Sequence, residues 1–573
     1  MSMKKMNERK RTFLLMTIPV VALFFCFNTL PLLKGVMYSF TNFKGFGSYD
    51  WVGVRNYMDL FQDVRVGNSY WFTFKLAIVT TIVVNVISLL LAMALNSKIR
   101  AKSFFRGAYF LPNILGALVV GYIFNYFFTY ILPAVGEMIG WETLSSSLLS
   151  SKNLAWIAIV IVCAWQAIAM NTIIYISGLQ TVPEDVYEAG AIDGATGWNK
   201  FKNLTFPLIL PFFTINMVLC VKNFLMVFDQ IMALTKGGPA QSTESISYLI
   251  YQNGMAGGPF GFQPSECQCG YFLPCDRCNF SDADDSIREK GGAVMIGANT
   301  KTNKPAMIFL VLGLITIAFP LYLTVVIAFK QPSEMTNSIS GILSLPSSWS
   351  LENFREAMRV TDFWNSLGNS LFITLVTVAL SIVIHSMIGY AIGRNKAHSK
   401  GYNLVYLYIV SGMFVPFAIL MMPLVKQTAQ MGLNNRFGVI LLYVVFYMPM
   451  NVLLYTGYLK NIPIALEEAA CVDGASTWTT YWKIVFPIMR PMHATVAVLT
   501  ALGTWNDVMT PLVIMSGGEQ NTLPLAQLTF QTQFGTNYNL AFASYLLALL
   551  PILIFYLICQ KQILNGVVNG AVK

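Results

Sequence analysis

Four closely spaced cysteines form the arrangement in this sequence that looks most like a chemical site. They follow the pattern C-x-C-x5-C-x2-C, at Cys267, Cys269, Cys275 and Cys278. Cysteine thiolates at such spacings are typical ligands of a structural zinc ion. Taken alone, the pattern indicates a small metal site.

Other signatures of enzyme chemistry are absent from the sequence. A glycine-rich run, GGAVMIGANTKT at 291–302, lacks the G-K-[ST] ending of a nucleotide-binding P-loop. The histidines His385, His398 and His493 are scattered, with neither metal-ligand nor catalytic-triad spacing. His385 and His493, which lie in or beside apolar segments, are expected to be buried and hydrogen-bonded. We therefore expect no catalytic residue, no cofactor and no ATP site in this chain, and we do not expect an enzyme.

The pattern that carries functional information occurs twice. VPEDVYEAGAIDGATGWNKFKNLTFPLILP begins at Val182, and IPIALEEAACVDGASTWTTYWKIVFPIMRP begins at Ile462. A constant offset aligns the two copies, with the matched pairs Pro183 and Pro463, Glu188 and Glu468, Asp193 and Asp473, Gly194 and Gly474, and Pro207 and Pro487. A repeat of this length means that the two halves of the chain are homologous.

Each copy predicts a short surface helix that another protein could contact. In the first copy, Thr181 is expected to cap the helix and Glu184 to close a capping box. A glycine that readily takes a left-handed conformation ends each helix. Small residues let a partner approach the backbone, and a glutamate is available to pair with a partner's basic side chain. The candidate docking residues are Glu188, Ala189, Gly190, Asp193, Gly194, Glu468, Ala469, Ala470, Asp473 and Gly474. The alternative is an ordinary helical connection, although such connections run only about 2–8 residues.

The elements that must position these loops are membrane-spanning helices. The chain of 573 residues is 55% hydrophobic and only 11% charged, whereas soluble domains carry roughly 25% charged residues. Its mean hydropathy is +0.58. Apolar runs long enough to cross a bilayer lie near 12–34, 70–95, 107–131, 153–178, 207–232, 306–330, 366–393, 403–425, 438–458, 491–514 and 540–559. The expected fold is an all-α, polytopic membrane protein of two homologous bundles, each with about five to six transmembrane helices.

Basic residues predict the orientation in the membrane. The formal charge is +10, and Lys and Arg cluster just outside apolar runs, at 4–11, 98–106 and 394–400. This placement is the positive-inside pattern rather than a nucleic-acid-binding face. The N-terminus and both repeated loops are therefore expected in the cytoplasm, in a multi-pass arrangement, and no nucleic-acid partner is expected.

The repeated pattern, E-A-A followed after three residues by G, resembles the loop of permease subunits in binding-protein-dependent ABC importers. It stands here as Glu188-Ala189-Gly190 with Gly194 and as Glu468-Ala469-Ala470 with Gly474, Gly190 being a departure that keeps a small side chain. Further stretches look like carbohydrate-type permeases of the maltose and glycerol-phosphate kind. Those at 51–61 and 235–251 are similar to the larger subunit, and those at 329–335, 345–358 and 505–512 to the smaller.

The resemblance implies an activity and a set of partners. The chain would form the translocation path of an ATP-driven carbohydrate importer in a bacterial cytoplasmic membrane. Two cytoplasmic ABC ATPase subunits, an extracytoplasmic solute-binding protein, membrane lipid and a carbohydrate substrate would be its partners. Two alternatives stay open: an importer permease for another solute class, such as peptides or amino acids, and a non-transport membrane receptor or scaffold.

Polar and aromatic side chains near the middle of the membrane are the candidates for substrate contacts. They are Asn223, Phe228, Asp229, Trp505 and Asn506. An acidic group inside a membrane is a functional candidate by default. The competing interpretation is that the aromatic residues serve helix packing.

The junction between the halves does not fit the rest of the chain. The first half has five apolar runs and the second has six, and the missing one should fall near 265–285. That segment carries acidic residues, each of which would cost about 2.5–3.5 kcal/mol at the centre of a membrane helix. Without a helix there, the first half ends outside while the second must begin inside.

The genetic code offers an explanation. Read from the second base of each codon, 266–295 can encode small and apolar residues, followed by Lys or Arg. Met295 and Ile296 must supply ATG-A, which contains the stop codon TGA in the shifted frame. We therefore predict a first permease domain over 1–263, an aberrant junction over 264–294 and a second permease domain over 295–573. In this interpretation two genes are fused by a frameshift near Gln263, and the cysteine cluster binds no metal.

Overall fold

The computed structural model describes residues 3–43, 45, 47–97, 99–254, 303–334, 341, 343–515, 520–532 and 535–571. Within these residues, nine helices are long and apolar enough to cross a membrane, and two further pairs of helices pass the same test together but are sharply bent. Five of the spans belong to the first half, and four spans with both bent pairs belong to the second. The predicted imbalance of five against six is therefore confirmed for the described residues.

The first half consists of helices and short helical turns joined by loops. Its elements are α1 (Met3–Phe24), η1 (Phe25–Thr29), α2 (Leu30–Tyr38), α3 (Arg55–Gln62), α4 (Val64–Asn96), α5 (Lys102–Phe110), η2 (Leu111–Asn113), α6 (Ala117–Tyr126), η3 (Phe127–Ile131), α7 (Leu132–Ile139), η4 (Leu148–Ser150), α8 (Ala155–Thr181), α9 (Glu184–Ile192), α10 (Gly197–Lys200), η5 (Phe201–Thr205), α11 (Phe206–Leu225), α12 (Asp229–Leu234) and α13 (Ile246–Gly254).

The second half repeats this plan and adds a long C-terminal helix. Its helical elements are α14 (Lys304–Phe329), η9 (Pro332–Glu334), α16 (Glu352–Val360), α17 (Phe363–Asn395), α18 (Lys400–Ser411), η10 (Gly412–Phe414), α19 (Phe417–Gln430), α20 (Arg436–Leu459), α21 (Ala465–Val472), α22 (Thr477–Thr480), η11 (Tyr481–Val485), α23 (Phe486–Ile488), α24 (Arg490–Asn506), α25 (Met509–Ile514), α26 (Leu523–Ala526), η13 (Gln527–Phe530) and α27 (Tyr538–Ala571). Two short strands, β1 (Gln531–Thr532) and β2 (Gly535–Thr536), pair antiparallel before α27. The all-α fold class is otherwise confirmed.

Proline interrupts two of the apolar runs that the sequence predicts as spans. An uninterrupted span near 403–425 would contain Pro416, but the chain bends by 100° between Lys400–Phe414 and Phe417–Gln430. Proline has no N–H to continue the ladder and forces the preceding residue out of the helical region. Val415 accordingly has an extended backbone, with ψ of 111°. Pro112 lies in η2, between α5 and α6, so it also marks a break.

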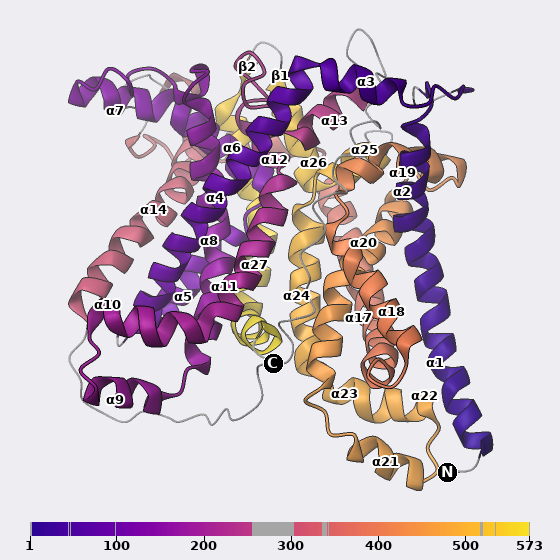
Figure 1. Cartoon of the computed structure of the whole chain (residues 1–573). Coiled ribbons are helices and arrows are strands. Elements are labelled where there is room, and N and C mark those ends of the chain that lie inside the picture. The colour runs from indigo at the N-terminus through magenta and orange to yellow at the C-terminus, as the bar shows by residue number, and fades with distance from the viewer. Residues whose placement is uncertain are drawn as a thin grey trace.

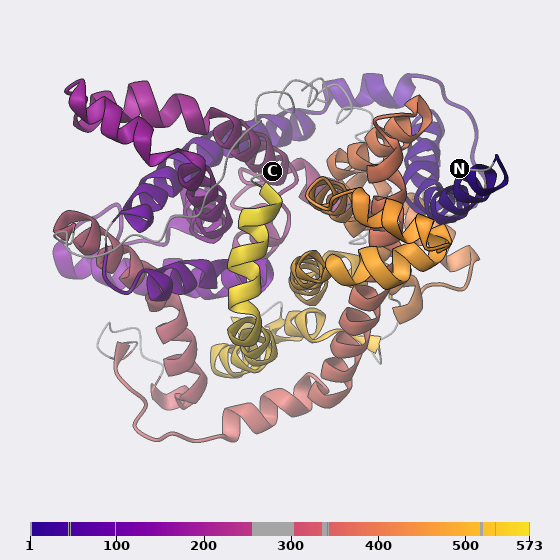
Figure 2. The same cartoon turned by 90° about the horizontal axis from the view of Figure 1, so that it is seen from below.

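The first helix of each half packs against the opposite half. The hydroxyls of Thr29 and Tyr408 lie 2.5 Å apart, and the Gln427 side chain donates to the Cys26 carbonyl at 2.9 Å, so α1 and α2 are attached to the second half. Figure 2 shows α1 and α2 beside the helices of the second half. In return, Tyr109 of α5 donates to the Leu310 carbonyl of α14 at 2.9 Å.

The C-terminal helix α27 completes this exchange. The Tyr556 hydroxyl donates to the Gly107 carbonyl at 3.0 Å, and its ring stacks on Phe110 of the first half. Tyr545, nearer the start of the same helix, stacks on Tyr122. The two halves therefore form one interlocked body rather than two bundles that merely touch.

The loops sort to the two ends of this body as the basic residues predicted. The N-terminal end of α1 lies at the same end as α9 and α21, whereas α3, α7 and α13 lie at the opposite end (Figure 1). We call these the loop-helix end and the outer end. The described part of the first half finishes with α13 at the outer end. The second half begins with α14, whose start lies at the loop-helix end, where Leu310 meets Tyr109.

The predicted junction over 264–294, with its cysteine cluster, lies outside the described residues.

Candidate functional site

The two repeated loops fold into short helices, α9 and α21, with the same C-terminal cap. In α9, the Ala195 N–H bonds the Gly190 carbonyl at 2.8 Å and the Gly194 N–H bonds the Ala191 carbonyl at 3.2 Å. Gly194 has a φ of +76°, and its counterpart Gly474 has +84°. The paired bonds and the left-handed glycine are those of a Schellman motif. The predicted role of both glycines in ending the helices is confirmed.

The beginning of α9 differs from the expected cap. Pro183 is the N-cap residue and no side chain accepts a cap hydrogen bond there. The Thr181 hydroxyl instead donates to the Gly178 carbonyl at 2.8 Å, because α8 continues through Thr181. The predicted capping box is therefore wrong: the hydroxyl is used by the preceding helix.

The small residues of the two loops divide between an inner and an exposed face. Ala189 and Ala469 are exposed, as are Glu188 and Glu468 one position earlier. The small residues one position later, in contrast, are buried within the chain itself. A Cβ on Gly190 would lie 2.3 Å from the Leu204 side chain, and Ala470 is 5% exposed. The expectation that all four small residues face a partner is therefore corrected for Gly190 and Ala470.

Sequence reasoning missed an apolar residue at the tip of each loop helix. Ile192 is 87% exposed and Val472 is 86% exposed, and the repeat offset matches the two positions. They lie directly before the exposed acids Asp193 and Asp473. The signal was present in the sequence, as an apolar residue repeated before the D-G of each loop. Nothing in the sequence alone showed that these side chains point away from the chain.

A buried ion pair attaches the second loop helix to the membrane helix α17. Arg394 Nε donates to Glu467 at 2.7 Å, and the two side chains are 9% and 6% exposed. The Tyr390 hydroxyl donates to the other Glu467 oxygen at 2.9 Å. The remaining Arg394 nitrogens donate to the carbonyl of Leu459, the last residue of α20, and to that of Ile462 in the following loop. Both charges are thus held by several hydrogen bonds, which a buried pair requires.

The first loop helix lacks this pair among the described residues. The repeat offset places Tyr187 where the second copy has Glu467. Tyr187 carries an aromatic contact instead, with the Lys200 ammonium 4.4 Å from its ring centroid. The two loop helices therefore share their cap and their exposed residues but differ in how they are attached.

A polar cluster lies where three helices break near the contact of the two halves. Asn506, the last residue of α24, donates to the Ile114 carbonyl between η2 and α6 at 2.8 Å. Gln166 of α8 donates to the adjacent Leu115 carbonyl at 2.8 Å and accepts from Gln230 of α12 at 3.0 Å. In many secondary transporters, discontinuous helices with such polar groups form the substrate site.

The predicted substrate-path residues distribute unevenly around this cluster. Asn506 belongs to it, and Asp229 is the neighbour of Gln230 at the start of α12. Trp505 is 5% exposed and packs in a hydrophobic cluster, and Phe228 packs against the rings of Tyr248 and Tyr251. Asn223 is exposed on α11. The packing interpretation therefore describes Trp505 and Phe228 better than a substrate contact does, and the role of Asn223 and Asp229 stays a prediction.

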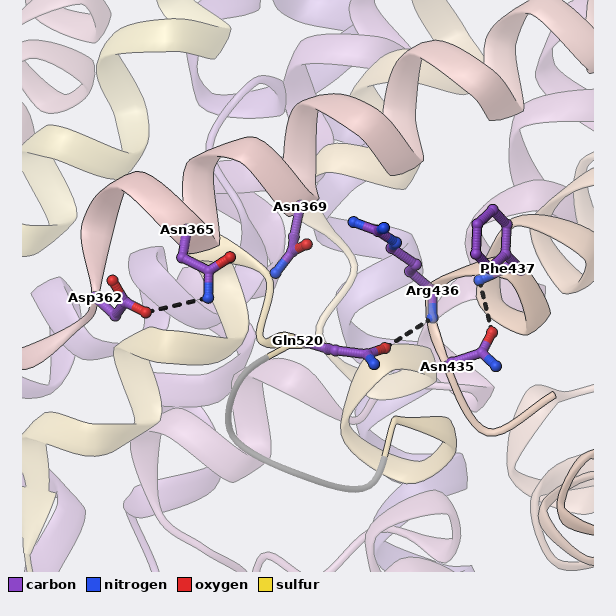
Figure 3. A pocket seen from close by; sticks show the side chains of 7 residues that line it. All are labelled: Asp362, Asn365, Asn369, Asn435, Arg436, Phe437 and Gln520. Carbon is purple, nitrogen blue, oxygen red and sulfur yellow. Dashed lines mark hydrogen bonds between the residues drawn. The ribbon is translucent and has the colours of Figure 1, made fainter. Parts of the chain in front are cut away.

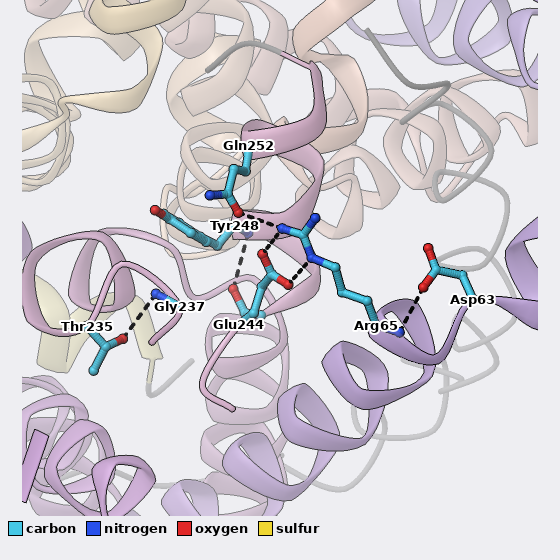
Figure 4. A network of polar contacts seen from close by, with 8 residues as sticks. Asp63, Arg65, Thr235, Gly237, Glu244, Tyr248 and Gln252 are labelled. Atoms are coloured by element: carbon cyan, nitrogen blue, oxygen red, sulfur yellow. Dashed lines mark hydrogen bonds and ion pairs between the residues drawn. The ribbon is translucent and has the colours of Figure 1, made fainter. Parts of the chain in front are cut away.

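A second ion pair fixes the outer end of the first half. Arg65, at the start of α4, makes two bonds to Glu244, at 2.7 and 2.6 Å, and a third to Gln252 of α13 (Figure 4). Glu244 is 1% exposed. It lies in the stretch at 235–251 that resembles the larger subunit of carbohydrate permeases. The two parallel bonds from the guanidinium to the carboxylate fix the loop before α13 against α4.

His385 and His493 are buried and hydrogen-bonded, as predicted. His385 is fully buried, with Nε2 2.9 Å from the Val444 carbonyl and Nδ1 3.0 Å from the Asn451 amide. His493 bonds the Tyr455 hydroxyl and the Phe486 carbonyl. The described residues contain no group of His, Cys, Asp or Glu side chains arranged to hold a metal.

The fold and these sites define a multi-pass helical membrane protein with two homologous, interlocked halves and paired loop helices on one end. Comparison with protein families gives the class. The family described as "Binding-protein-dependent transport system inner membrane component" matches residues 84–329 and 385–567. Because these segments cover more than half of the chain, the chain belongs to this family of transport components, whose members are not enzymes.

Curated relatives match the chain in pieces of about half its length. The multiple sugar-binding transport system permease proteins MsmG and MsmF of Streptococcus mutans are each 38% identical to it. The alignments cover 46% and 44% of this chain but 95% and 86% of the relatives. The probable starch degradation products transport system permease protein AmyD of Thermoanaerobacterium thermosulfurigenes is 38% identical over 39% of this chain and 76% of its own.

The ion pair of the second loop helix yields a stability prediction. Glu467→Gln leaves the Arg394 charge buried without its carboxylate, and breaking such a pair costs about 3–5 kcal/mol. Thermal unfolding of the purified protein in nanodiscs measures the loss. Glu468→Gln is the matched control, because that neighbouring carboxylate is exposed, and surface changes typically stay within about 0.5 kcal/mol. Equal unfolding temperatures for the two variants would show that the pair does not anchor α21.

Proposed function

We propose that this chain forms the translocation path of an ATP-driven carbohydrate importer in a bacterial cytoplasmic membrane. Two ABC ATPase subunits dock on α9 and α21 in the cytoplasm, where the N-terminus also lies. A solute-binding protein delivers the sugar to the outer end. The observation that carries the proposal is the pair of matched loop helices at one end of a protein of this family.

The carbohydrate class rests on the relatives and on the stretches that resemble carbohydrate permeases. MsmG and MsmF are named for multiple sugar-binding transport, and AmyD for starch degradation products. Uptake of labelled sugars by the source bacterium, with and without the gene, tests this assignment. Loss of maltotriose or arabinotriose uptake on deletion supports it. Loss of amino-acid or peptide uptake instead would favour another solute class, and no transport defect would favour a scaffold.

The docking surface on each loop helix combines an apolar tip with exposed acids. Burying Ile192 and Val472 against a partner removes two large apolar side chains from water, each worth about 1.5–3 kcal/mol. Glu188 and Glu468 stand ready to pair with basic groups of the ATPase. An apolar centre with a polar rim is the usual arrangement of a protein–protein interface.

The loop helices are attached to membrane helices, so they transmit movement of the ATPases to those helices. ATP binding favours the closed form of the ATPase pair. A partner shifts the equilibrium between two conformations of the permease only through its different affinity for them. Since Glu467 ties α21 to Arg394 of α17, displacement of α21 acts on that membrane helix. Because the halves are interlocked through α1, α14 and α27, neither half moves independently. The polar cluster at the helix breaks lies where the halves meet.

The docking proposal makes a direct prediction about the helix tips. Ile192→Asp and Val472→Asp place an unpaired carboxylate where an apolar side chain becomes buried, which is costly. Each variant, introduced at the chromosomal locus, is expected to reduce copurification of the ATPase subunits about tenfold, a loss of 1.4 kcal/mol. The double variant is expected to abolish ATP-dependent uptake.

The matched control for these variants is Trp141→Asp, the same type of change at an exposed apolar residue just after α7, a helix of the outer end. It should leave ATPase copurification unchanged. Normal copurification by the Ile192→Asp and Val472→Asp variants would refute the docking role of the helix tips.

We also infer that the junction over 264–294 results from a frameshift between two permease genes. The described first half finishes at the outer end and the second begins at the loop-helix end, so the chain between them must change sides. Asp and Glu residues in that segment make a crossing helix expensive. Relatives that each match about half of this chain support two separate genes.

Sequencing the DNA across codons 260–296 tests this inference. We expect an extra or missing base just before the codon of Pro264, a restored frame that encodes an apolar helix, and a stop overlapping the start codon of Met295. The purified chain should also contain no stoichiometric zinc. A single intact frame, together with a full-length product that transports, would contradict the proposal.

A further inference from the structure

A polar pocket at the outer end of the second half is used by neither the docking helices nor the polar cluster (Figure 3). Its volume is about 520 Å³, within the range of small-ligand sites. One wall is the start of α17, where Asp362, Asn365 and Asn369 lie on one face because their spacing follows the helical period. The opposite wall is the first turn of α20, and Gln520 lies between the two.

Hydrogen bonds already fix the frame of this pocket. The Asn435 side chain accepts from the Phe437 N–H at 2.9 Å and so caps α20. Gln520 Oε1 accepts from the Arg436 N–H at 3.2 Å. Asn369, which is 5% exposed, donates to the Asn521 carbonyl at 3.3 Å. The walls are therefore held in place before any ligand arrives, which lowers the cost of ordering on binding.

The charged side chains of the pocket keep hydrogen-bonding capacity beyond the bonds that hold its walls. The Arg436 guanidinium lies over the rings of Phe372 and Phe437, at 4.9 and 5.5 Å from their centroids, and has no carboxylate partner among the described residues. Asp362 accepts, through its carboxylate, a hydrogen bond of 3.1 Å from the Asn365 amide. Its φ of +43° is unusual for a residue other than glycine, and such strained residues concentrate at binding sites.

The balance of charge in the pocket selects the kind of ligand. One carboxylate and one guanidinium cancel, so neither an anionic lipid headgroup nor an organic cation is favoured. Planar amide, carboxylate and guanidinium groups offer pairs of donors and acceptors to adjacent hydroxyls. The ring of Phe437 is 56% exposed and offers an apolar face to a C–H surface. A neutral molecule with many hydroxyl groups satisfies all three features.

We propose that this pocket is an accessory carbohydrate-binding site that holds one or two residues of a neutral oligosaccharide at the outer end of the second half. The proposal rests on the proposed function and extends it by a second contact point for the same class of substrate. Asp362 and Arg436 bind the hydroxyl groups, the amides of Asn365 and Gln520 add hydrogen bonds, and Phe437 covers one face of the sugar.

Equilibrium dialysis with radiolabelled maltotriose and arabinotriose tests the site on the purified chain in nanodiscs, without ATPase or binding protein. We expect saturable binding that weakens at least about tenfold, a loss of 1.4 kcal/mol, in Arg436→Lys, which keeps the charge but removes the planar fork. Asp362→Asn should weaken binding similarly. The controls are Arg359→Lys and Glu356→Gln, which make the corresponding changes to an arginine and a carboxylate in an exposed pair on α16, and they should bind as the unchanged chain does. Thermal unfolding verifies that all variants stay folded.

Three results would overturn the site. They are no sugar binding by the unchanged chain, equal binding by pocket and control variants, and binding of glycerol phosphate that tightens in Asp362→Asn, which would indicate an anion site. Sugar uptake by the source bacterium separates the two proposals. Uptake that persists without binding in nanodiscs removes the accessory site alone, whereas absence of sugar uptake in the parent strain removes the proposed function on which it rests.

Discussion

The pairing of backbone polar groups inside a membrane is the constraint on which this structure depends. Hydrocarbon offers no hydrogen-bond partner, so the chain can cross only as helices that satisfy their own N–H and C=O groups. Each crossing then moves the chain to the other side. The common end of the N-terminus and α9, which are four spans apart, follows from the number of crossings between them, as does the common end of α21 and the start of α14, which are also four spans apart. So does the conflict at the junction, where the first half stops at the wrong end for the second to begin.

Breaks in the helices are tolerated only where the protein itself supplies partners. The carbonyls of Ile114 and Leu115, freed between η2 and α6, receive bonds from Asn506 and Gln166. Polar side chains thus gather at the breaks because the backbone needs them, and the same groups become available to a substrate. The first helix of each half packs against the opposite half, and this exchange holds the helix breaks of the two halves next to one another.

Much of this architecture could be predicted from the sequence, and the exceptions share a cause. Apolar runs, basic flanks and the repeated loops are local or periodic signals, and they predicted the spans, their imbalance and the glycine caps of α9 and α21. The bond between Arg394 and Glu467, the exchange of α1 and α14 between halves and the inward packing of Gly190 against Leu204 depend on contacts across the fold. The failed cap at Thr181 has the same origin, because the hydroxyl serves the longer helix α8. The effect of Pro416 could have been inferred from its restriction on Val415, but not the angle of the bend.

The central claim is that both loop helices face one side of the membrane, opposite the outer loops. Labelling with a membrane-impermeant maleimide tests it most directly, using Ile192→Cys, Val472→Cys and Trp141→Cys introduced separately at the chromosomal locus, with labelling of the parent protein subtracted. All three side chains are more than half exposed. The account predicts that the cysteines at 192 and 472 react only in inside-out vesicles, after the ATPase subunits have been stripped from them, and that the one at 141 reacts only in intact cells. Reaction of the cysteines at 192 and 472 from opposite sides would contradict it.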